Sequence, residues 1–348
     1  MNKVTHIVWS LATGGVETML VNIINEQVKY IDVQLIVIND NIYEPLLNKI
    51  SHRCDVRLCR RKPGKKDYFS VVKVNWWLTL FRPHIIHVHS KNLKKFVVGN
   101  YKIVRTIHNT RNITKEYPEM AALYAISNTV KDYTAKQGFP NVIVVENGIR
   151  VSDFQSRESL DSNNNIFHIV QVGRIFTKQK GQEKVLEALE ILIKNRAITC
   201  FIYHIIGEGP DEHYLKELVK KKNLDKYVIF EGLKSQDYLH QNLKNFDLFV
   251  QPSNYEGFGL TVAEAIAAKV PVLVSDIEGP MEIIGNGKYG MYFKKGDVID
   301  LANKLETILK GGYDYGKIEP AYEYVESHYD VSTTAKKYIE EYKKVINK

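Results

Sequence analysis

The chain has 348 residues, of which 44% are hydrophobic and 25% are charged. This is about twice the usual domain length, so two domains are expected, and the composition is ordinary for a protein with buried cores. No apolar run approaches the roughly 18 residues that a membrane span requires, and the apolar start meets two glycines too early for a signal peptide. Three cysteines without zinc-site spacing agree with a reducing compartment. We therefore expect a cytoplasmic protein.

The basic excess is confined to the first half of the chain. Residues 1–165 hold 23 Lys and Arg against 14 Asp and Glu, a net charge of +9, whereas residues 166–348 hold 25 against 26, a net charge of −1. Cations are densest from Arg53 to Lys66. A one-sided basic domain indicates nucleic acid or an anionic membrane face as partner, with a solvated loop as the plain alternative. Because this run lacks aromatic residues until Tyr68, we expect a membrane and no nucleic acid.

Apolar segments alternate with helical patterns along the first half. A strand expected over Val4–Trp9 leads to Gly14 and Gly15, and a helix over Val16–Val28 follows. A glycine loop between a strand and a helix is the geometry by which a Rossmann-like unit approaches phosphate. Further strands are expected over Val33–Ile38, His84–His89, Lys102–Ile107, Ala121–Ser127 and Val142–Val145.

An aromatic-rich helix is expected directly after the basic run. Its apolar stripe consists of Phe69, Val72, Trp76 and Leu80. A stripe of this kind normally faces a core, so we expect it to be buried. Beside the basic run, the pair Trp76 and Trp77 offers an alternative, a position at a membrane interface.

Histidines mark the ends of two expected strands. His87 and His89 fall on one face of their strand. A metal site is disfavoured, because no cysteine or carboxylate lies nearby in the sequence to complete it. We expect His87 to be a hydrogen-bonded core residue and His89 to lie at the carboxyl end of the strand, where α/β proteins bind ligands. His108 follows the next strand in the same way.

The alternation restarts after a polar segment, residues 152–165, which we interpret as the domain boundary. A strand expected over Ile166–Val172 ends at Arg174, and Lys180 stands at the start of the next helix. An arginine and a lysine at these points are well placed to hold one diphosphate from two sides. Two solvated surface cations are the alternative.

The stretch from Asn254 to Ala267 combines a carboxylate, a glycine turn and the start of a helix. Glycines permit a close backbone approach, and the first turn of a helix presents unpaired amides and a positive dipole end. Glu256 and Glu264 add hydrogen-bond acceptors on either side of these donors. Phosphates need donors and sugar hydroxyls need acceptors, so a sugar joined to a nucleotide diphosphate satisfies the whole segment. The donor row consists of Gly257, Phe258, Gly259, Leu260 and Thr261.

The sequence E-G-F-G-L-T-V-A-E-A-I-A from Glu256, followed by P-V-L-V-S, resembles the donor-site signature of the family 4 glycosyltransferases. Two further motifs are similar to those of the family: Gly-Gly-Val-Glu at residues 14–17 and Gly-Arg-x5-Lys-Gly at residues 173–181. The match is partial after the Asn-Gly turn at residues 147–148, where Arg150 stands in place of the usual acid.

The resemblance implies the α/β fold called GT-B, in which two Rossmann-like domains face each other across a cleft. The acceptor-binding domain would comprise residues 1–152, with residues 332–348 crossing back onto it. The domain that binds the nucleotide-sugar donor would comprise residues 165–331.

The resemblance also implies roles for the site residues. His108 and Glu256 would be catalytic, with Glu256 on the sugar hydroxyls and His108 positioning the sugar and the acceptor. Glu264 would hold the ribose. The expected donor-binding set is Gly14, Gly15, Arg174, Lys180, Gly257, Phe258, Gly259, Leu260, Thr261 and Glu264. The family is retaining, so the anomeric configuration would be kept.

The expected function is transfer of a UDP-linked hexose or N-acetylhexosamine to a lipid-linked glycan acceptor in surface polysaccharide biosynthesis, as in capsule or exopolysaccharide formation. The chain contains no Asp-x-Asp, the motif that holds a divalent metal in many such enzymes, so neither metal nor cofactor is expected. The protein would bind peripherally at the inner face of the cell membrane. The alternatives are a sugar-nucleotide epimerase of the same fold and a non-catalytic protein that binds glycans or anionic surfaces.

Overall fold

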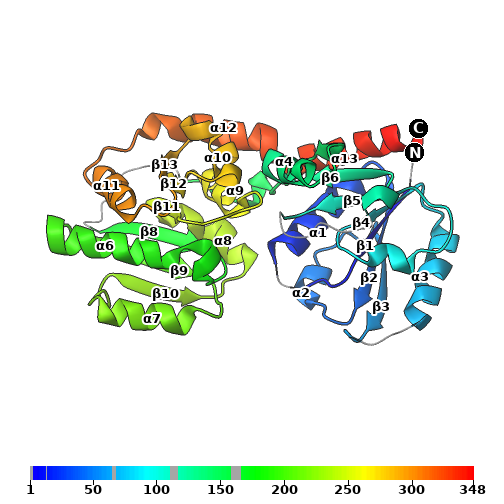
Figure 1. Ribbon diagram of the computed structural model, residues 1–348, viewed down its shortest axis with the longest axis horizontal. Coiled ribbons are helices and arrows are strands. Elements are labelled where there is room, and N and C mark those ends of the chain that lie inside the picture. The colour runs from blue at the N-terminus through cyan, green and yellow to red at the C-terminus, as the bar shows by residue number, and fades with distance from the viewer. Residues whose placement is uncertain (1–2, 13, 65–67, 110–116, 158–165) are drawn as a thin grey trace. The chain divides into compact units, whose positions relative to one another are not determined.

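The chain forms two compact units (Figure 1). The computed structural model describes residues 3–12, 14–64, 68–109, 117–157 and 166–348. Unit 1 consists of Met1–Arg150 together with Tyr329–Lys348, and unit 2 consists of Val151–His328. None of the described helices combines the length and the apolar character that crossing a bilayer demands.

Unit 1 is built on a parallel sheet. Its described part has seven strands in the spatial order β3-β2-β1-β4-β5-β6-β7, and each strand is parallel to its neighbours. Helices cover both faces of the sheet, so a strand such as β2 is buried along nearly its whole length. The strands are β1 (Lys3–Val8), β2 (Asp32–Asn39), β3 (Asp55–Arg61), β4 (Ile85–Val88), β5 (Ile103–Ile107), β6 (Ala122–Ala125) and β7 (Val142–Val144).

Two apolar cores flank this sheet. One includes α1 and the C-terminal helix α13, and the other includes α3. α13 packs against α1, and its buried residues Ala335, Tyr338, Ile339 and Tyr342 follow helical spacing. The helices are α1 (Gly15–Gln27), α2 (Glu44–Leu47), α3 (Tyr68–Phe81), α4 (Asn128–Lys136) and α13 (Val331–Ile346), with 3₁₀ turns η1 (Leu93–Phe96) and η2 (Tyr117–Glu119).

Unit 2 repeats this architecture with its own core. In the described residues its parallel sheet has six strands in the order β10-β9-β8-β11-β12-β13. The strands are β8 (Phe167–Val172), β9 (Phe201–Ile206), β10 (Val228–Gly232), β11 (Leu248–Gln251), β12 (Val272–Ser275) and β13 (Met291–Phe293). The helices are α5 (Thr177–Lys180), α6 (Gln182–Arg196), α7 (Glu212–Lys221), α8 (Gln236–Asn242), α9 (Leu260–Ala267), α10 (Glu278–Ile283), α11 (Val298–Leu309) and α12 (Ile318–Tyr329). The 3₁₀ turns are η3 (Val151–Asp153), η4 (Leu243–Asn245), η5 (Gly285–Gly287) and η6 (Tyr315–Lys317).

A network of histidines lies in the interior of unit 1. The two ring nitrogens of His87 bond to the hydroxyl groups of Tyr342, at 2.5 Å, and Thr106, at 2.7 Å. The prediction that His87 is a hydrogen-bonded core residue is therefore confirmed. Its ring stacks on His89 with the centroids 4.1 Å apart. Burial lowers the pKa of His6 to about 4 and the pKa values of His87 and His89 well below their ordinary range, so these rings are neutral near pH 7.

The expectation that the aromatic stripe of α3 faces a core is wrong. Phe69, Val72, Trp76 and Leu80 are between 62% and 66% exposed. The helix buries another stripe that includes Val74 and Leu78. Because α3 is apolar around most of its circumference, periodicity alone did not distinguish the inner stripe from the outer one.

A strand inside the basic run was missed. β3 pairs in parallel with β2 at the edge of the sheet, with Cys59 buried and Val56 and Leu58 partly buried. The cations of this run therefore lie partly on a strand rather than in a solvated loop. The apolar residues between the arginines could have indicated this strand, but the many charges around them made the segment resemble a loop.

The buried histidines predict a loss of stability in mild acid. For His6 the folded-state pKa is about 4 and the ordinary value is 6.5, so between these values the unfolded state binds more protons. The free energy of unfolding should therefore rise with pH across this window and level off above it, with each such histidine contributing up to about 1.4 kcal/mol per pH unit.

Urea unfolding followed by Trp fluorescence measures this, because all three Trp residues lie in unit 1. Replacing His87 by Gln should flatten the slope between about pH 5 and pH 7. The matched control is His213→Gln, because the His213 side chain is 86% exposed in unit 2. A stability of unit 1 that does not change over this range would contradict the account.

Two glycines of unit 2 provide a test of the local packing. Gly181 and Gly296 both have left-handed backbone, with φ of 66° and 78°. A Cβ at Gly296 would meet open space, whereas a Cβ at Gly181 would overlap the carbonyl of Pro252. We expect Gly296→Ala to cost about 1 kcal/mol and Gly181→Ala at least about twice as much. Thermal unfolding of the two variants tests this, and equal losses would contradict the close approach at Pro252.

Candidate active site

The strand order of unit 2 reverses between β8 and β11, which are neighbours in the sheet. In doubly wound sheets, ligands bind at the carboxyl ends of strands beside such a reversal. Here those ends lead into residues 173–180 after β8 and residues 252–259 after β11. The expected donor-binding residues of the second half, with Glu264 in the helix that follows, lie in or directly after these two loops.

Lys180 and Glu256 join the two loops. The Lys180 Nζ atom lies 2.5 Å from Glu256 Oε1, and Ser253 donates a hydrogen bond of 2.9 Å to the same oxygen. The side chains of Lys180 and Glu256 are only 16% and 10% exposed. Charges so far removed from water persist only when paired and hydrogen-bonded, so each partner holds the other in place.

Glu264 lies in the second turn of α9. Gln236, the first residue of α8, donates a hydrogen bond of 3.0 Å to Glu264 Oε1. Burial raises the pKa of Glu264, while the Gln236 hydrogen bond and the charge of Lys180 act in the opposite direction. Glu264 therefore lies close enough to Lys180 for their charges to attract each other. Sequence analysis missed Gln236. Its position shortly after β10, at the same carboxyl ends of the strands, could have indicated that it lies near the site.

The start of α9 supplies backbone donors. Gly259 precedes the helix with φ of 108°, and no side chain caps it. The amide of Val262 donates a hydrogen bond of 2.9 Å to the Gly259 carbonyl. The amides before it belong to the first turn of the helix, where no carbonyl of the same helix is in place to accept from them. Thr261 donates a hydrogen bond of 2.8 Å to Gln251 at the end of β11. The sequence reasoning did not single out Gln251 or Ser253.

The other expected donor-site residues differ in exposure. Arg174 is exposed after β8, and Phe258 is buried, so its side chain serves packing while its backbone remains part of the loop. Gly14 and Gly15 are exposed at the start of α1 in unit 1, and Gly14 has extended backbone with φ of 178°. Thr13, beside them, lies outside the described residues.

His108 lies just after β5 and is partly buried. Its Nε2 atom is 3.4 Å from His89 Nδ1. His89 follows directly after β4, as expected. Burial, with the charge of Arg105, lowers the pKa of His108 to about 4, so it is neutral near pH 7 and suits hydrogen bonding rather than charge pairing. Thr110 lies outside the described residues.

In the described part of the chain, the residues with metal-ligand spacing are His6, His87 and His89, whose ring nitrogens gather within 4.8 Å. Every ring nitrogen of these residues already has a protein partner. A metal would have to replace several of these bonds in a core without a carboxylate ligand. The arrangement therefore favours a hydrogen-bond network.

Two family models match the chain. Glycosyl transferases group 1 matches residues 152–323, and Glycosyltransferase Family 4 matches residues 13–153. The poly(ribitol-phosphate) alpha-N-acetylglucosaminyltransferase of Staphylococcus aureus is 26% identical over 62% of this chain and 39% of its own length. The UDP-Gal:alpha-D-GlcNAc-diphosphoundecaprenol alpha-1,3-galactosyltransferase of Escherichia coli is 25% identical over 72% of this chain and 73% of its own. The chain spans less than two thirds of several other curated relatives.

The fold also has solved counterparts. The Anabaena protein HepE, in complex with UDP and glucose, matches with a TM-score of 0.79 at 20% identity, over 98% of this chain and 99% of its own. The two family models together span residues 13–323, and several curated relatives are named as glycosyltransferases. The chain therefore belongs to the family 4 glycosyltransferases and has the GT-B fold.

Proposed function

We propose that this glycosyltransferase moves a UDP-linked hexose or N-acetylhexosamine onto a lipid-linked glycan, with retention of configuration and without a metal, in surface polysaccharide biosynthesis. The names of the relatives support the substrate classes. The Escherichia coli relative is named for a UDP-linked galactose donor and a diphosphoundecaprenol acceptor. The Anabaena structure holds UDP and glucose.

The observation that carries the proposal is the mixture of donors and acceptors at one edge of unit 2. The Lys180–Glu256 pair, the exposed Arg174 and the first turn of α9 lie around the reversal of strand order. We assign Arg174, Lys180 and the α9 amides to the diphosphate. Glu264 is assigned to the ribose hydroxyls, and Glu256 to the hydroxyls of the transferred sugar.

The same groups account for catalysis without a metal. Departure of a nucleotide diphosphate concentrates negative charge on its phosphate oxygens. Fixed cations and helix amides aimed at those oxygens stabilise this charge without reorganising in the reaction. Lys180 is fixed by Glu256 and Ser253 binds the same carboxylate, so these donors are in place before the ligand arrives.

Replacing Glu256 by Gln should lower kcat for transfer at least about 100-fold, because it removes both the sugar contact and the carboxylate that positions Lys180. The thermal midpoint should fall, because Lys180 is left mostly buried without its carboxylate partner, so the rates are compared at a temperature at which both proteins are folded. Turnover of UDP-sugars with a prenyl diphosphate saccharide acceptor, followed by release of UDP, is the measurement.

The matched control is Glu217→Gln on α7, whose side chain is 67% exposed, and it should leave the rate unchanged. A chelator added to the wild-type enzyme should also leave the rate unchanged. An unaffected rate in Glu256→Gln would contradict the role of Glu256, and inhibition by the chelator would contradict the metal-free mechanism. Conversion of the UDP-sugar to its epimer without acceptor would indicate the epimerase instead.

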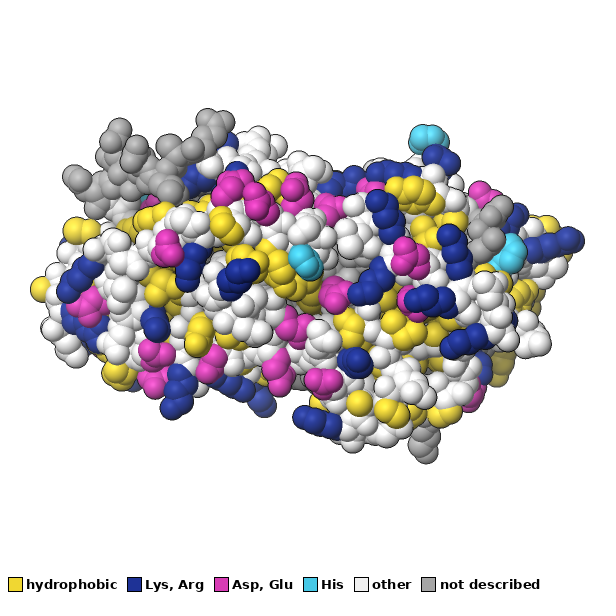
Figure 2. All heavy atoms as spheres, turned by 90° about the horizontal axis from the view of Figure 1, so that it is seen from above, with side chains coloured by type: hydrophobic (Ala, Val, Ile, Leu, Met, Phe, Trp, Pro, Cys, Tyr) yellow, Lys and Arg dark blue, Asp and Glu magenta, His cyan; other side chains and the backbone are white. Residues whose placement is uncertain are grey.

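We also propose that the enzyme binds peripherally to the inner face of the cell membrane through the outer face of α3, defined by Phe69, Val72, Trp76 and Leu80. These side chains are more than 60% exposed on one side of a single helix. Lys73 lies over the ring of Phe69 at 5.1 Å. Exposed aromatic and aliphatic side chains beside cations are the features of an interfacial helix on anionic lipid. Figure 2 shows Lys and Arg side chains spread over the right-hand part of its face, which is unit 1.

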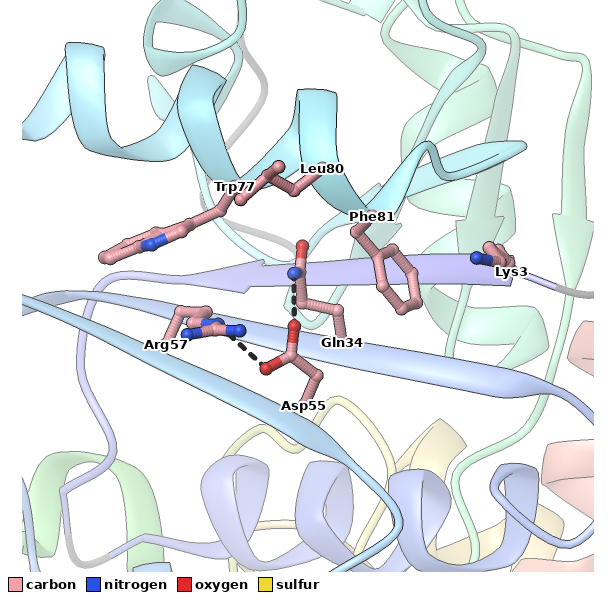
Figure 3. Close-up of a pocket in the computed structure, with 7 residues that line it drawn as sticks. All are labelled: Lys3, Gln34, Asp55, Arg57, Trp77, Leu80 and Phe81. Carbon is pink, nitrogen blue, oxygen red and sulfur yellow. Dashed lines mark hydrogen bonds and ion pairs between the residues drawn. The ribbon is translucent and has the colours of Figure 1, made fainter.

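A small pocket adjoins this outer face. It has a volume of about 180 Å³ and opens between α3 and the amino-terminal halves of β1, β2 and β3 (Figure 3). His108 lies at the other end of the strands, after the carboxyl end of β5. Asp55 binds Arg57 at 2.8 Å and accepts a hydrogen bond from Gln34 at 2.7 Å. The remaining lining residues are Lys3, Trp77, Leu80 and Phe81. Leu80 belongs to both the pocket and the outer face, so the two form one continuous surface.

Replacing Phe69, Trp76 and Leu80 together by Ser should weaken binding to anionic vesicles at least about tenfold, because each large apolar side chain contributes about 1.5–3 kcal/mol when buried. Co-sedimentation with vesicles that contain phosphatidylglycerol is the measurement. Vesicles of phosphatidylcholine alone should bind less, and added salt should weaken the binding.

The matched control replaces three exposed apolar residues of unit 2, Tyr214, Leu233 and Ile299, by Ser. These side chains are 51%, 62% and 56% exposed, so the loss of apolar surface is similar. Equal binding by both triple variants would overturn the assignment of the membrane surface to α3.

A further inference from the structure

A continuous chain of polar side chains runs through the interior of unit 1 and ends at His108. Gln27 Oε1 lies 2.8 Å from His6 Nε2, and His6 Nδ1 lies 2.9 Å from His89 Nε2. His89 Nδ1 lies 3.4 Å from His108 Nε2. Gln27, His6 and His89 are buried and come from α1, from β1 and from the residue after β4. Three separate elements therefore meet in one line of hydrogen bonds.

Each ring in this chain carries one proton near neutral pH. Burial lowers the pKa values of His6 and His108 to about 4 and lowers that of His89 well below its ordinary range, so none of the three is charged there. A neutral imidazole donates from one nitrogen and accepts at the other. Such a chain has two arrangements, in which all of its hydrogen bonds point toward Gln27 or all point away from it.

The orientation of the Gln27 amide decides between the two. Its oxygen lies toward His6, and an oxygen accepts. The amide nitrogen is buried and has no hydrogen-bond partner among the described residues, so Gln27 acts on this chain through its oxygen.

The proton positions follow one after another. Because Gln27 accepts, His6 carries its proton on Nε2 and accepts on Nδ1. His89 then donates from Nε2 and accepts on Nδ1, so His108 must donate from Nε2. The Nδ1 atom of His108 is left without a proton. It is buried and has no hydrogen-bond partner among the residues that the structure describes.

We propose that Gln27, His6 and His89 are positioning residues that fix His108 as the tautomer with a proton on Nε2 and a bare Nδ1. His108 then presents a hydrogen-bond acceptor, which binds a hydroxyl or amide donor and cannot donate to a phosphate oxygen. His87 packs on the side of the chain, with its ring 4.1 Å from that of His89 and its own nitrogens bonded elsewhere. It stabilises the chain without being part of it.

The consequence for catalysis rests on the proposed function. If His108 contacts the sugar or the acceptor, its bare nitrogen accepts from a hydroxyl group of that ligand. The wrong tautomer would place two donors against each other, and a buried polar group without its partner weakens the complex. The tautomer itself is a property of the unliganded protein, so it is measurable without any substrate.

Long-range proton–nitrogen correlation NMR of protein labelled with ¹⁵N-histidine tests the proposal directly. The signals of His108 are identified by their loss in His108→Gln. Near pH 7.5 we expect His108 to show a protonated Nε2 and a bare Nδ1. A protonated Nδ1 would overturn the proposal, and so would an equal mixture of the two tautomers.

Two variants test the origin of the tautomer. Gln27→Leu removes the terminal acceptor and should convert His108 to a mixture, whereas Gln27→Glu retains an acceptor oxygen and should preserve the wild-type tautomer. A purely structural role of Gln27 would leave the His108 tautomer unchanged in Gln27→Leu, and that result would contradict the proposal. If Gln27→Leu fails to fold, the wild-type spectrum still decides between the two arrangements.

Steady-state kinetics separate this proposal from the proposed function. Gln27→Leu should lower kcat about tenfold with little change in the KM for the nucleotide sugar, and Gln27→Glu should restore it. Absence of transfer in the wild-type protein, together with the expected tautomer, would reject the proposed function alone. Normal transfer with a protonated Nδ1 on His108 would reject the positioning role alone.

Discussion

The ion pair of Lys180 and Glu256 is the constraint on which the candidate active site of unit 2 depends. It joins the loops after β8 and β11, and Ser253, which binds Glu256, accepts a hydrogen bond of 2.6 Å from Ser275 at the end of β12. Three strand ends are thereby fixed to one carboxylate. An ammonium group has three donors, so Lys180 can hold Glu256 and still bind a phosphate oxygen. The partner that stabilises the charge in the free protein thus also orients it for a ligand.

The two units place different kinds of side chain at the same reversal of strand order. In unit 2 the loops at the reversal carry charged groups, among which Arg174 is exposed and Lys180 is paired. In unit 1 the corresponding strands, β1 and β4, bring together buried rings that burial keeps neutral, with His89 joined to His6. A charged edge suits a diphosphate, and a neutral hydrogen-bonding edge suits hydroxyl groups. This division follows from the residues at the strand ends, because the sheets themselves are alike.

Sequence reasoning predicted the local structure correctly at the turn of Gly259 and at the start of the helix that follows it. Glu256, the turn at Gly259 and the helix start lie within one short segment, so their spacing predicts how they lie together. It failed on α3, where apolar residues occupy both stripes and only tertiary packing selects the buried one. It did not predict the pairing of Lys180 with Glu256 or the chain that links Gln27 to His108, because these partners are far apart in sequence.

Hydrogen–deuterium exchange with a nucleoside diphosphate tests the central claim most directly, since it locates the ligand without requiring an acceptor. UDP, GDP and ADP are added in turn to the wild-type protein, and exchange is compared with that of the free protein. The account predicts that one of them slows exchange in residues 173–181 and in residues 252–264, around Lys180 and Glu256. Protection confined to other segments, or no protection by any of the three, would contradict it.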